Sequence, residues 1–180
     1  MTFSDGVIRL EIPGEKYFKQ YEEYREEFLA SGDSMDGTGP LRRCDTGEKW
    51  LEEVNKYRDR ETVPEGKVVA TQFIGVRESD GRIVGMVQVR HYLNEYLKKY
   101  AGHIGYSVRP TERRKGFAKR MLALSLKFCR TIGIKKVMVS CLEENEASRR
   151  TIVSNGGVFV RREFEPDEKK YLEIYNIDLG

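Results

Sequence analysis

One stretch restricts the possible folds of this chain more than any other, because it joins two different periodicities through a glycine turn. Ile104, Tyr106 and Val108 recur at every second residue, which predicts a half-buried strand stopped by Pro110. Beyond the turn, apolar residues recur at helical spacing, at Phe117, Met121, Leu124, Phe128 and Ile132. The stretch therefore predicts a strand, a tight turn and a long helix in direct succession.

The turn has the composition of an anion-binding site and reads Arg113-Arg114-Lys115-Gly116-Phe117-Ala118. The first turn of a helix carries unpaired backbone N–H groups and the positive end of the helix dipole. Gly116 leaves room for a phosphate to approach the backbone, and Ala118 adds little bulk. Against one acid, Glu112, the cations around the turn are Arg109, Arg113, Arg114, Lys115, Lys119 and Arg120. We expect this turn to hold a phosphorylated ligand.

The turn also resembles the Gln/Arg-x-x-Gly-x-Gly/Ala signature of the GNAT acyltransferase superfamily, with Arg113, Gly116 and Ala118 at the defined positions. A second block is similar to a later part of the family pattern. Residues 136–141 read as a strand, and Asn145-Glu146-Ala147-Ser148 resembles the Asn-x-x-Ser/Ala start of a helix. The resemblance covers residues 68–178 and is vague before them.

The resemblance implies an α/β (α+β) fold in a single domain over residues 1–180. We expect a GNAT-like mixed, mostly antiparallel sheet of about six to seven strands flanked by helices, with a splayed parallel strand pair at the cofactor cleft. The strands expected from the residues are 7–12, 68–77, 83–91, 101–108, 136–141, 158–160 and 171–179. Helices are expected at 15–30, 50–60, 117–132 and from Asn145 to Gly156, with a short helix or excursion at 93–100. The long polar loop 31–46 is expected to form the wall that recognises the acceptor.

In function, the resemblance implies transfer of an acetyl group from acetyl-coenzyme A to a primary amine, directly within a ternary complex. The main chain of Tyr106 and Val108 would pair with the pantetheine arm and thioester, and Asn145 would bind a pantetheine amide. Backbone N–H groups at the turn would hold the pyrophosphate. The expected cofactor-binding residues are Tyr106, Val108, Arg113, Arg114, Lys115, Gly116, Phe117, Ala118, Lys119, Asn145 and Ser148. We prefer direct transfer because no Cys stands in a nucleophile–base motif.

The chain departs from the family pattern at the catalytic acid. Many members place a Tyr seven residues after this Asn to protonate the leaving thiolate, and here that position is Ile152. Tyr106, Cys141 and Ser148 are the nearest alternative acids in the sequence. A thiolate also leaves without an acid more readily than an alkoxide does, because the pKa of a thiol is near 8.5.

The sequence offers several residues that could be the base that removes a proton from the amine. His103 and Glu95 are the candidates, with His91 close by, since each could act directly or through a water. The alternation of a strand argues against His103, whose side chain would face away from Tyr106 unless a bulge intervenes.

Simpler interpretations exist for the same residues. The basic turn could be solvated, and Asn145 could be only a helix cap, although a cap can also contact a ligand. Because Ile152 replaces the usual acid, the alternative function is a non-catalytic coenzyme A-binding sensor or interaction module. Nucleic-acid binding is not expected, since no aromatic residues are interleaved with the basic turn.

Composition sets outer limits on partners and location. The formal charge of +3 is nearly balanced among 34% charged residues, so it does not demand a nucleic-acid partner. The three cysteines form no Cys-x-x-Cys pair, which favours a reducing compartment and predicts no metal site. No apolar run reaches the roughly 18 residues of a membrane span, and residues 1–5 are not a signal peptide. We expect a cytoplasmic acetyltransferase with a small-molecule or peptide amine acceptor, and a homodimer is plausible.

Overall fold

The computed structural model describes residues 1–180 and contains two antiparallel sheets. The first has the order β1-β2-β3-β4-β5, and its strands are Thr2–Ser4, Ile8–Glu11, Ala70–Arg77, Ile83–Arg90 and Ile104–Val108. The second has the order β6-β8-β7, and these strands are Lys136–Leu142, Lys170–Asp178 and Val158–Glu165. Every pairing within a sheet is antiparallel. The expected α+β, mostly antiparallel architecture is confirmed. Its eight strands form two sheets where one sheet of about six to seven strands was expected, and β1 is the strand that the sequence did not predict.

Four α-helices flank the sheets: α1 (Phe18–Ser31), α2 (Gly47–Asn55), α3 (Phe117–Thr131) and α4 (Glu146–Val153). Short 3-10 turns lie at Glu15–Tyr17, Leu41–Arg43, Lys56–Arg58 and Pro110–Glu112. The excursion expected at 93–100 contains a π-helical turn, Leu97–Ala101. None of these helices combines the length and the apolar character needed to cross a bilayer.

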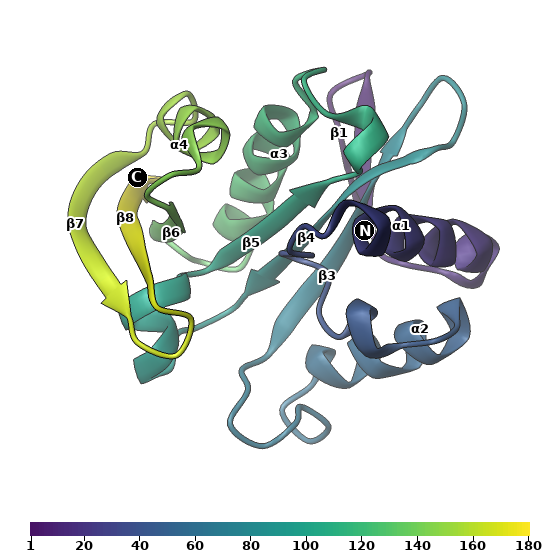
Figure 1. Cartoon of the computed structure of the whole chain (residues 1–180), viewed down its shortest axis with the longest axis horizontal. Helices are drawn as coiled ribbons and strands as arrows, with labels where there is room; N and C mark the ends of the chain where they lie inside the picture. Colours follow the sequence, from purple (N-terminus) through teal and green to yellow (C-terminus); the bar gives the residue numbers. More distant parts are fainter.

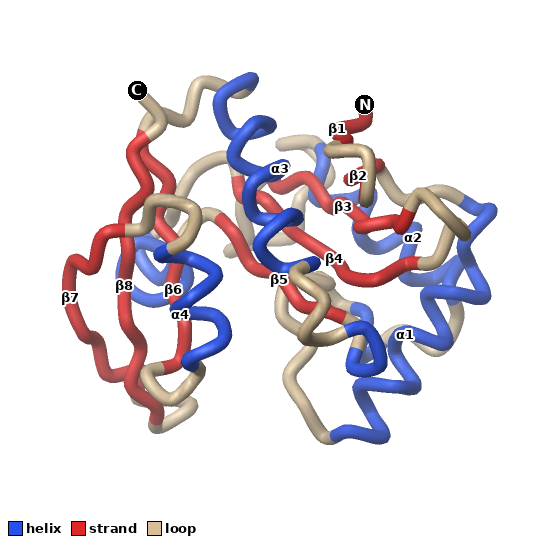
Figure 2. The backbone as a smooth tube through the Cα atoms, turned by 90° about the horizontal axis from the view of Figure 1, so that it is seen from above, coloured by secondary structure: helices blue, strands red, loops and turns tan.

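The five-stranded sheet is covered on both faces, which gives the molecule two apolar cores (Figure 1). Phe73 and Ile74 are neighbours on β3 and point to opposite faces, as successive strand residues do. Phe73 packs with Met121 and Phe128 of α3, whereas Ile74 belongs to the cluster of α1 and α2. Seen from above, α3 lies between the two sheets (Figure 2). The strand before the basic turn and the helix after it are therefore both anchored in the core.

The two sheets meet at one isolated bridge, between Gly102 and Val139. Next to it, the His103 amide donates to the Met138 carbonyl over 2.7 Å. Beyond this point β5 and β6 belong to different sheets and share no ladder. The facing edge of β5 is therefore left unpaired, which is the condition for a ligand to enter. The parallel course expected for this strand pair stays a prediction.

The long loop after α1 is packed against β5. Gly37 adopts φ +71°, and a Cβ at this position would overlap the Gly105 carbonyl, so only glycine allows this approach. Gln72 Nε2 donates to the Gly37 carbonyl over 2.7 Å, and Trp50 Nε1 donates to the Thr38 carbonyl over 2.8 Å. Two buried side chains thus fix the loop as a wall beside β5.

Candidate functional site

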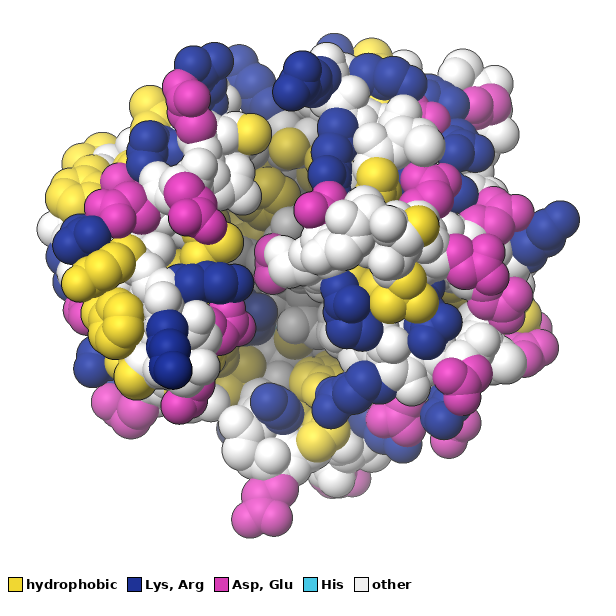
Figure 3. All heavy atoms as spheres, in the orientation of Figure 1, with side chains coloured by type: hydrophobic (Ala, Val, Ile, Leu, Met, Phe, Trp, Pro, Cys, Tyr) yellow, Lys and Arg dark blue, Asp and Glu magenta, His cyan; other side chains and the backbone are white.

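A cleft of about 900 Å³ opens where the two sheets separate. It is walled by β5, the end of β6, the first turns of α3 and α4, and the loop after α1. Figure 3 shows this hollow in the middle of one face of the molecule. Its volume lies in the range of pockets that enclose most of a ligand.

The basic turn presents unpaired amides to this cleft. None of the backbone N–H groups from Arg113 to Lys119 donates to an acceptor within the protein. Arg114 and Gly116 both have positive φ, 61° and 80°, in a turn that leads directly into α3. A left-handed residue next to a helical one turns successive amides toward one side and makes a concave anion site, and Gly116 followed by Phe117 is such a pair. The N-terminus of α3 also carries the positive end of the helix dipole, which attracts an anion as the amides do.

Most of the positive charge expected around this turn is already paired, which corrects the count from the sequence. The pairs are Arg109–Glu27 (2.6 Å), Arg113–Asp33 (2.6 Å), Lys115–Glu112 (2.8 Å) and Arg120–Asp5 (2.7 Å). Arg109 is only 2% exposed and helps to hold α1 against the end of β5. Arg114 and Lys119 make no ion pair, and both line the cleft. An anion at the turn would therefore meet two free cations and a series of amides.

On β5, the hydrogen-bond ladder decides which main-chain groups face the cleft. The Arg90 amide donates to the His103 carbonyl, and the Arg109 amide donates to the Val84 carbonyl. In an antiparallel ladder such pairs recur at every second residue, so Gly105, Ser107 and Arg109 bond to β4, as the carbonyl of His103 does. Ile104, Tyr106 and Val108 therefore direct their N–H and C=O groups toward the unpaired edge. This orientation is the one that the proposed contact of Tyr106 and Val108 with a pantetheine arm requires.

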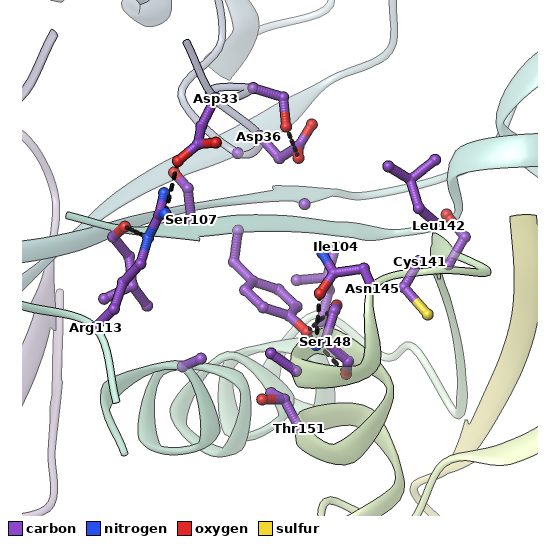
Figure 4. Close-up of a pocket in the computed structure, with 18 of the residues that line it drawn as sticks. Asp33, Asp36, Ile104, Ser107, Arg113, Cys141, Leu142, Asn145, Ser148 and Thr151 are labelled. Carbon is purple, nitrogen blue, oxygen red and sulfur yellow. Dashed lines mark hydrogen bonds and ion pairs between the residues drawn. The ribbon is translucent and has the colours of Figure 1, made fainter. Parts of the chain in front are cut away.

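The first turn of α4 forms the opposite wall. Asn145 caps this helix, because its Oδ1 accepts the Ser148 amide over 3.0 Å. The Asn145 Nδ2 makes no hydrogen bond in the protein, so capping leaves this donor free. Figure 4 shows Asn145, Ser148 and Thr151 on one side of the cleft and the Asp33–Arg113 pair on the other.

Comparison with known proteins agrees with this geometry. Residues 36–156 match the family described as the acetyltransferase (GNAT) family. The chain belongs to the GNAT acetyltransferase family. No curated protein matches its sequence.

Solved GNAT structures share its fold at low sequence identity. RimL, a ribosomal L7/L12 alpha-N-protein acetyltransferase in complex with coenzyme A, has a TM-score of 0.72 at 14% identity, covering 100% of each chain. The ribosomal-protein-S5-alanine acetyltransferase from Vibrio fischeri has a TM-score of 0.69 at 14% identity, covering 100% of this chain and 97% of that one. The microcin C7 self-immunity acetyltransferase MccE, in complex with acetyl-CoA and AMP, has a TM-score of 0.70 at 17% identity, covering 97% and 93%.

The family's usual acid position is part of the core in this GNAT protein. Ile152 is fully buried, and a Cβ on Gly157 would overlap its side chain. The three alternative acids named from the sequence, Tyr106, Cys141 and Ser148, all line the cleft. The Tyr106 hydroxyl lies 2.7 Å from Ser148 Oγ. Burial raises the pKa of Tyr106 to about 12, so its phenol is neutral and available as a donor.

The candidate bases lie elsewhere in the structure. His103 Nδ1 accepts the Met138 amide over 3.0 Å, which ties β5 to β6 outside the cleft. Glu95 has a side chain that is 93% exposed, and it pairs with Lys98. His91 Nε2 bonds to the Thr71 hydroxyl. None of these three residues lines the cleft.

The carboxylates that do line the cleft are Asp33, Asp36 and Glu144. Asp33 is bound to Arg113, which leaves Asp36 and Glu144 without a cation partner. The sequence indicated the loop that carries Asp36 through its length, but no periodic signal marked this residue. Glu144 precedes the cap Asn145, so its position could have been inferred from the predicted helix start.

His103 is expected to make stability fall below neutral pH. Burial and then the charge of Arg90 lower its pKa from 6.5 to about 4. Below about pH 6.5 the imidazole becomes protonated in the unfolded chain but stays neutral in the folded chain. The contribution of His103 to the free energy of unfolding is therefore complete above this pH and is lost as the pH falls toward 4. Burial lowers the pKa of His91 too, which adds to the decline. Melting curves between pH 7 and 4.5 should show it, and His103→Asn should flatten the profile; an unchanged slope in this variant would exclude His103 as a source.

Proposed function

We propose that this GNAT protein transfers an acetyl group from acetyl-coenzyme A to a primary amine, directly within a ternary complex. The observation that carries the proposal is the row of unpaired amides from Arg113 to Lys119 at the mouth of the cleft. A pyrophosphate satisfies such donors without protein rearrangement. Arg114 and Lys119 add charge at the same place.

The rest of the coenzyme is proposed to follow the unpaired edge of β5 toward the bridge at Gly102. The main chain of Tyr106 and Val108 would pair with the pantetheine amides, and Asn145 Nδ2 would donate to one of their carbonyls. An N–H group of this edge is also suited to polarise the thioester carbonyl, because it would bind the oxygen more strongly as negative charge develops there.

The proposed reaction accounts for every bond and proton with groups that line the cleft or with water. The acceptor ammonium loses one proton to water or a carboxylate, and its nitrogen then attacks the thioester carbonyl. A C–N bond forms, the C–S bond breaks, and coenzyme A leaves as a thiolate that takes up a proton. The Tyr106 hydroxyl is the neutral donor available to the developing thiolate.

Direct transfer is favoured over an acetyl-cysteine intermediate. Cys141 is the cysteine that lines the cleft. Burial, followed by the charge of Glu173, raises the pKa of its thiol to about 11. The nucleophilic form is the thiolate, which is scarce at neutral pH with such a pKa. We therefore assign Cys141 no covalent step.

The test is release of free thiol from acetyl-coenzyme A across a set of amine acceptors, combined with calorimetric binding of the coenzyme. Binding with amine-dependent thiol release is the expected result. Binding without release for any acceptor would favour the sensor alternative. No binding at all would reject the proposal. The structural neighbours include acetyltransferases of ribosomal proteins and a microcin C7 self-immunity acetyltransferase. The shared fold therefore does not indicate which acceptor this chain uses.

A further inference from the structure

A second pocket of about 240 Å³ adjoins the cleft. The two share Ser34, Asp36 and the end of β6 as walls, so the smaller one extends the larger. Its other walls come from the π-helical turn and from the β7–β8 hairpin, and they include Tyr96, Tyr100, Glu165, Glu168 and Lys170. The basic turn does not reach it, which places this pocket on the acceptor side of the proposed transfer site.

Glu165 is the most informative residue of this pocket. It is only 3% exposed, yet no cation lies within ion-pair distance of it. One carboxylate oxygen, Oε2, accepts the Glu168 amide, and Oε1 has no hydrogen bond in the protein. Oε1 is not among the fully buried polar atoms, so it is accessible from the pocket that Glu165 lines. A carboxylate with so little exposed surface is poorly hydrated, and a positively charged ligand in the pocket would stabilise it.

The remaining walls favour the same kind of ligand. Asp36 also has no cation partner, while Lys170 and Glu168 pair with each other over 3.5 Å. Tyr96 and Tyr100 lie with ring centroids 5.2 Å apart, and aromatic faces attract ammonium groups. The Lys99 ammonium already lies 5.1 Å from the Tyr100 centroid, so Tyr96 is the ring that a ligand ammonium would meet. Burial and the charges of Glu165 and Glu168 raise the pKa of Tyr96, so its phenol does not add negative charge. The charge of the nearby Arg90 partly offsets that of Asp36, so Glu165 carries the uncompensated charge of this pocket.

We propose that this pocket holds the distal ammonium group of an aliphatic diamine or polyamine, whose other amine is acetylated in the cleft. The inference rests on the proposed acetyl transfer and names its acceptor class. The pocket, of about 240 Å³, is a narrow extension of the 900 Å³ cleft, which suits a methylene chain with a charged end.

The experiment compares acceptors of similar length whose distal ends carry a positive charge, no charge or a negative charge. The set is 1,4-diaminobutane, 1,5-diaminopentane, butylamine, pentylamine and 4-aminobutanoate, with a lysine-containing tetrapeptide as the protein-like arm. We expect kcat/KM for thiol release to be about 100-fold higher for the diamines than for the monoamines, which corresponds to about 2.7 kcal/mol. The 4-aminobutanoate, with a negative distal end, should be the poorest acceptor.

Two matched variants test whether the preference for diamines over monoamines depends on the pocket. Glu165→Gln keeps the shape of the side chain and removes its charge, so it should reduce the diamine-to-monoamine ratio at least 10-fold. Glu163→Gln makes the same change on the same strand at a residue that pairs with Arg161 and does not line the pocket. It should leave the ratio unchanged. Melting curves of both variants establish that they fold.

Calorimetric titration of 1,4-diaminobutane into the coenzyme A-loaded protein separates this proposal from the transfer reaction. Binding that is weakened in Glu165→Gln supports the pocket even if no acetyl group moves. Equal kcat/KM for diamines and monoamines, an unchanged ratio in Glu165→Gln, or a preference for the tetrapeptide over every diamine would overturn the pocket while leaving the transfer activity intact. No thiol release with any amine, together with no coenzyme binding, would reject the transfer activity itself.

Discussion

Gly116→Glu should abolish acetyl-coenzyme A binding, with Kd raised at least 100-fold, whereas Gly133→Glu should leave Kd within about twofold of the wild-type value. The new carboxylate would stand among the unpaired amides and repel a pyrophosphate at the point where we propose that it binds. Gly116 and Gly133 flank the two ends of α3, both have φ +80°, and a Cβ at either position would meet no other atom within 4 Å. The backbone strain of the two variants is therefore matched, at about 1–3 kcal/mol each.

Thermal melting gives a second measurement of the same pair. A ligand present at 100 times its Kd stabilises the folded state by about 2.7 kcal/mol. For a chain of this length, 1 kcal/mol shifts Tm by about 2–4 °C, so saturating coenzyme should raise Tm by roughly 5–10 °C. The shift should persist in Gly133→Glu and vanish in Gly116→Glu. A full shift in Gly116→Glu would show that the phosphate does not bind at this turn, and loss of the shift in both variants would attribute it to strain in α3.

Local signals in the sequence were sufficient for most of the fold. Asp80-Gly81 predicted the β3–β4 hairpin, and Gly81 has the positive φ, +70°, that such a turn uses. The strand β7 was predicted only for residues 158–160 and extends to Glu165. It is an edge strand with charged residues, and a register shift between Phe159 and Arg161 interrupts its alternation. Three-residue β1 is too short for any period to reveal it.

For the site, prediction succeeded where a residue's role depends on its local backbone. Gly116 and Asn145 occupy the ends of helices that the sequence located, and both line the cleft. Roles that depend on distant partners were not accessible. The acids that pair with Arg109 and Arg113, Glu27 and Asp33, lie about 80 residues earlier in the chain. Strand alternation already argued against His103 as the base, and its bond to Met138 in the other sheet is the part that the sequence could not indicate.

Tyr106→Phe should lower kcat by about 10–100-fold while the KM for acetyl-coenzyme A stays within about twofold. The size of the effect follows from comparing two acids. The pKa of Tyr106 is about 12, well above the value near 8.5 for a thiol, so full proton transfer from the phenol to the leaving thiolate is uphill. We propose that the phenol instead donates a hydrogen bond to the developing charge, and such a bond to a charged group contributes about 1.5–3 kcal/mol.

The control is Tyr175→Phe. It also removes a hydroxyl from a strand tyrosine, in this case one that donates to Glu173 over 2.6 Å outside the cleft, so kcat should not change. Ser148→Ala removes the partner of the Tyr106 hydroxyl and leaves the phenol in place, and its effect on kcat should be several-fold smaller than that of Tyr106→Phe. If Tyr106→Phe retains the wild-type kcat, the thiolate leaves unaided. If it instead raises KM with kcat unchanged, Tyr106 serves coenzyme binding alone, because an interaction made only as the C–S bond breaks affects kcat.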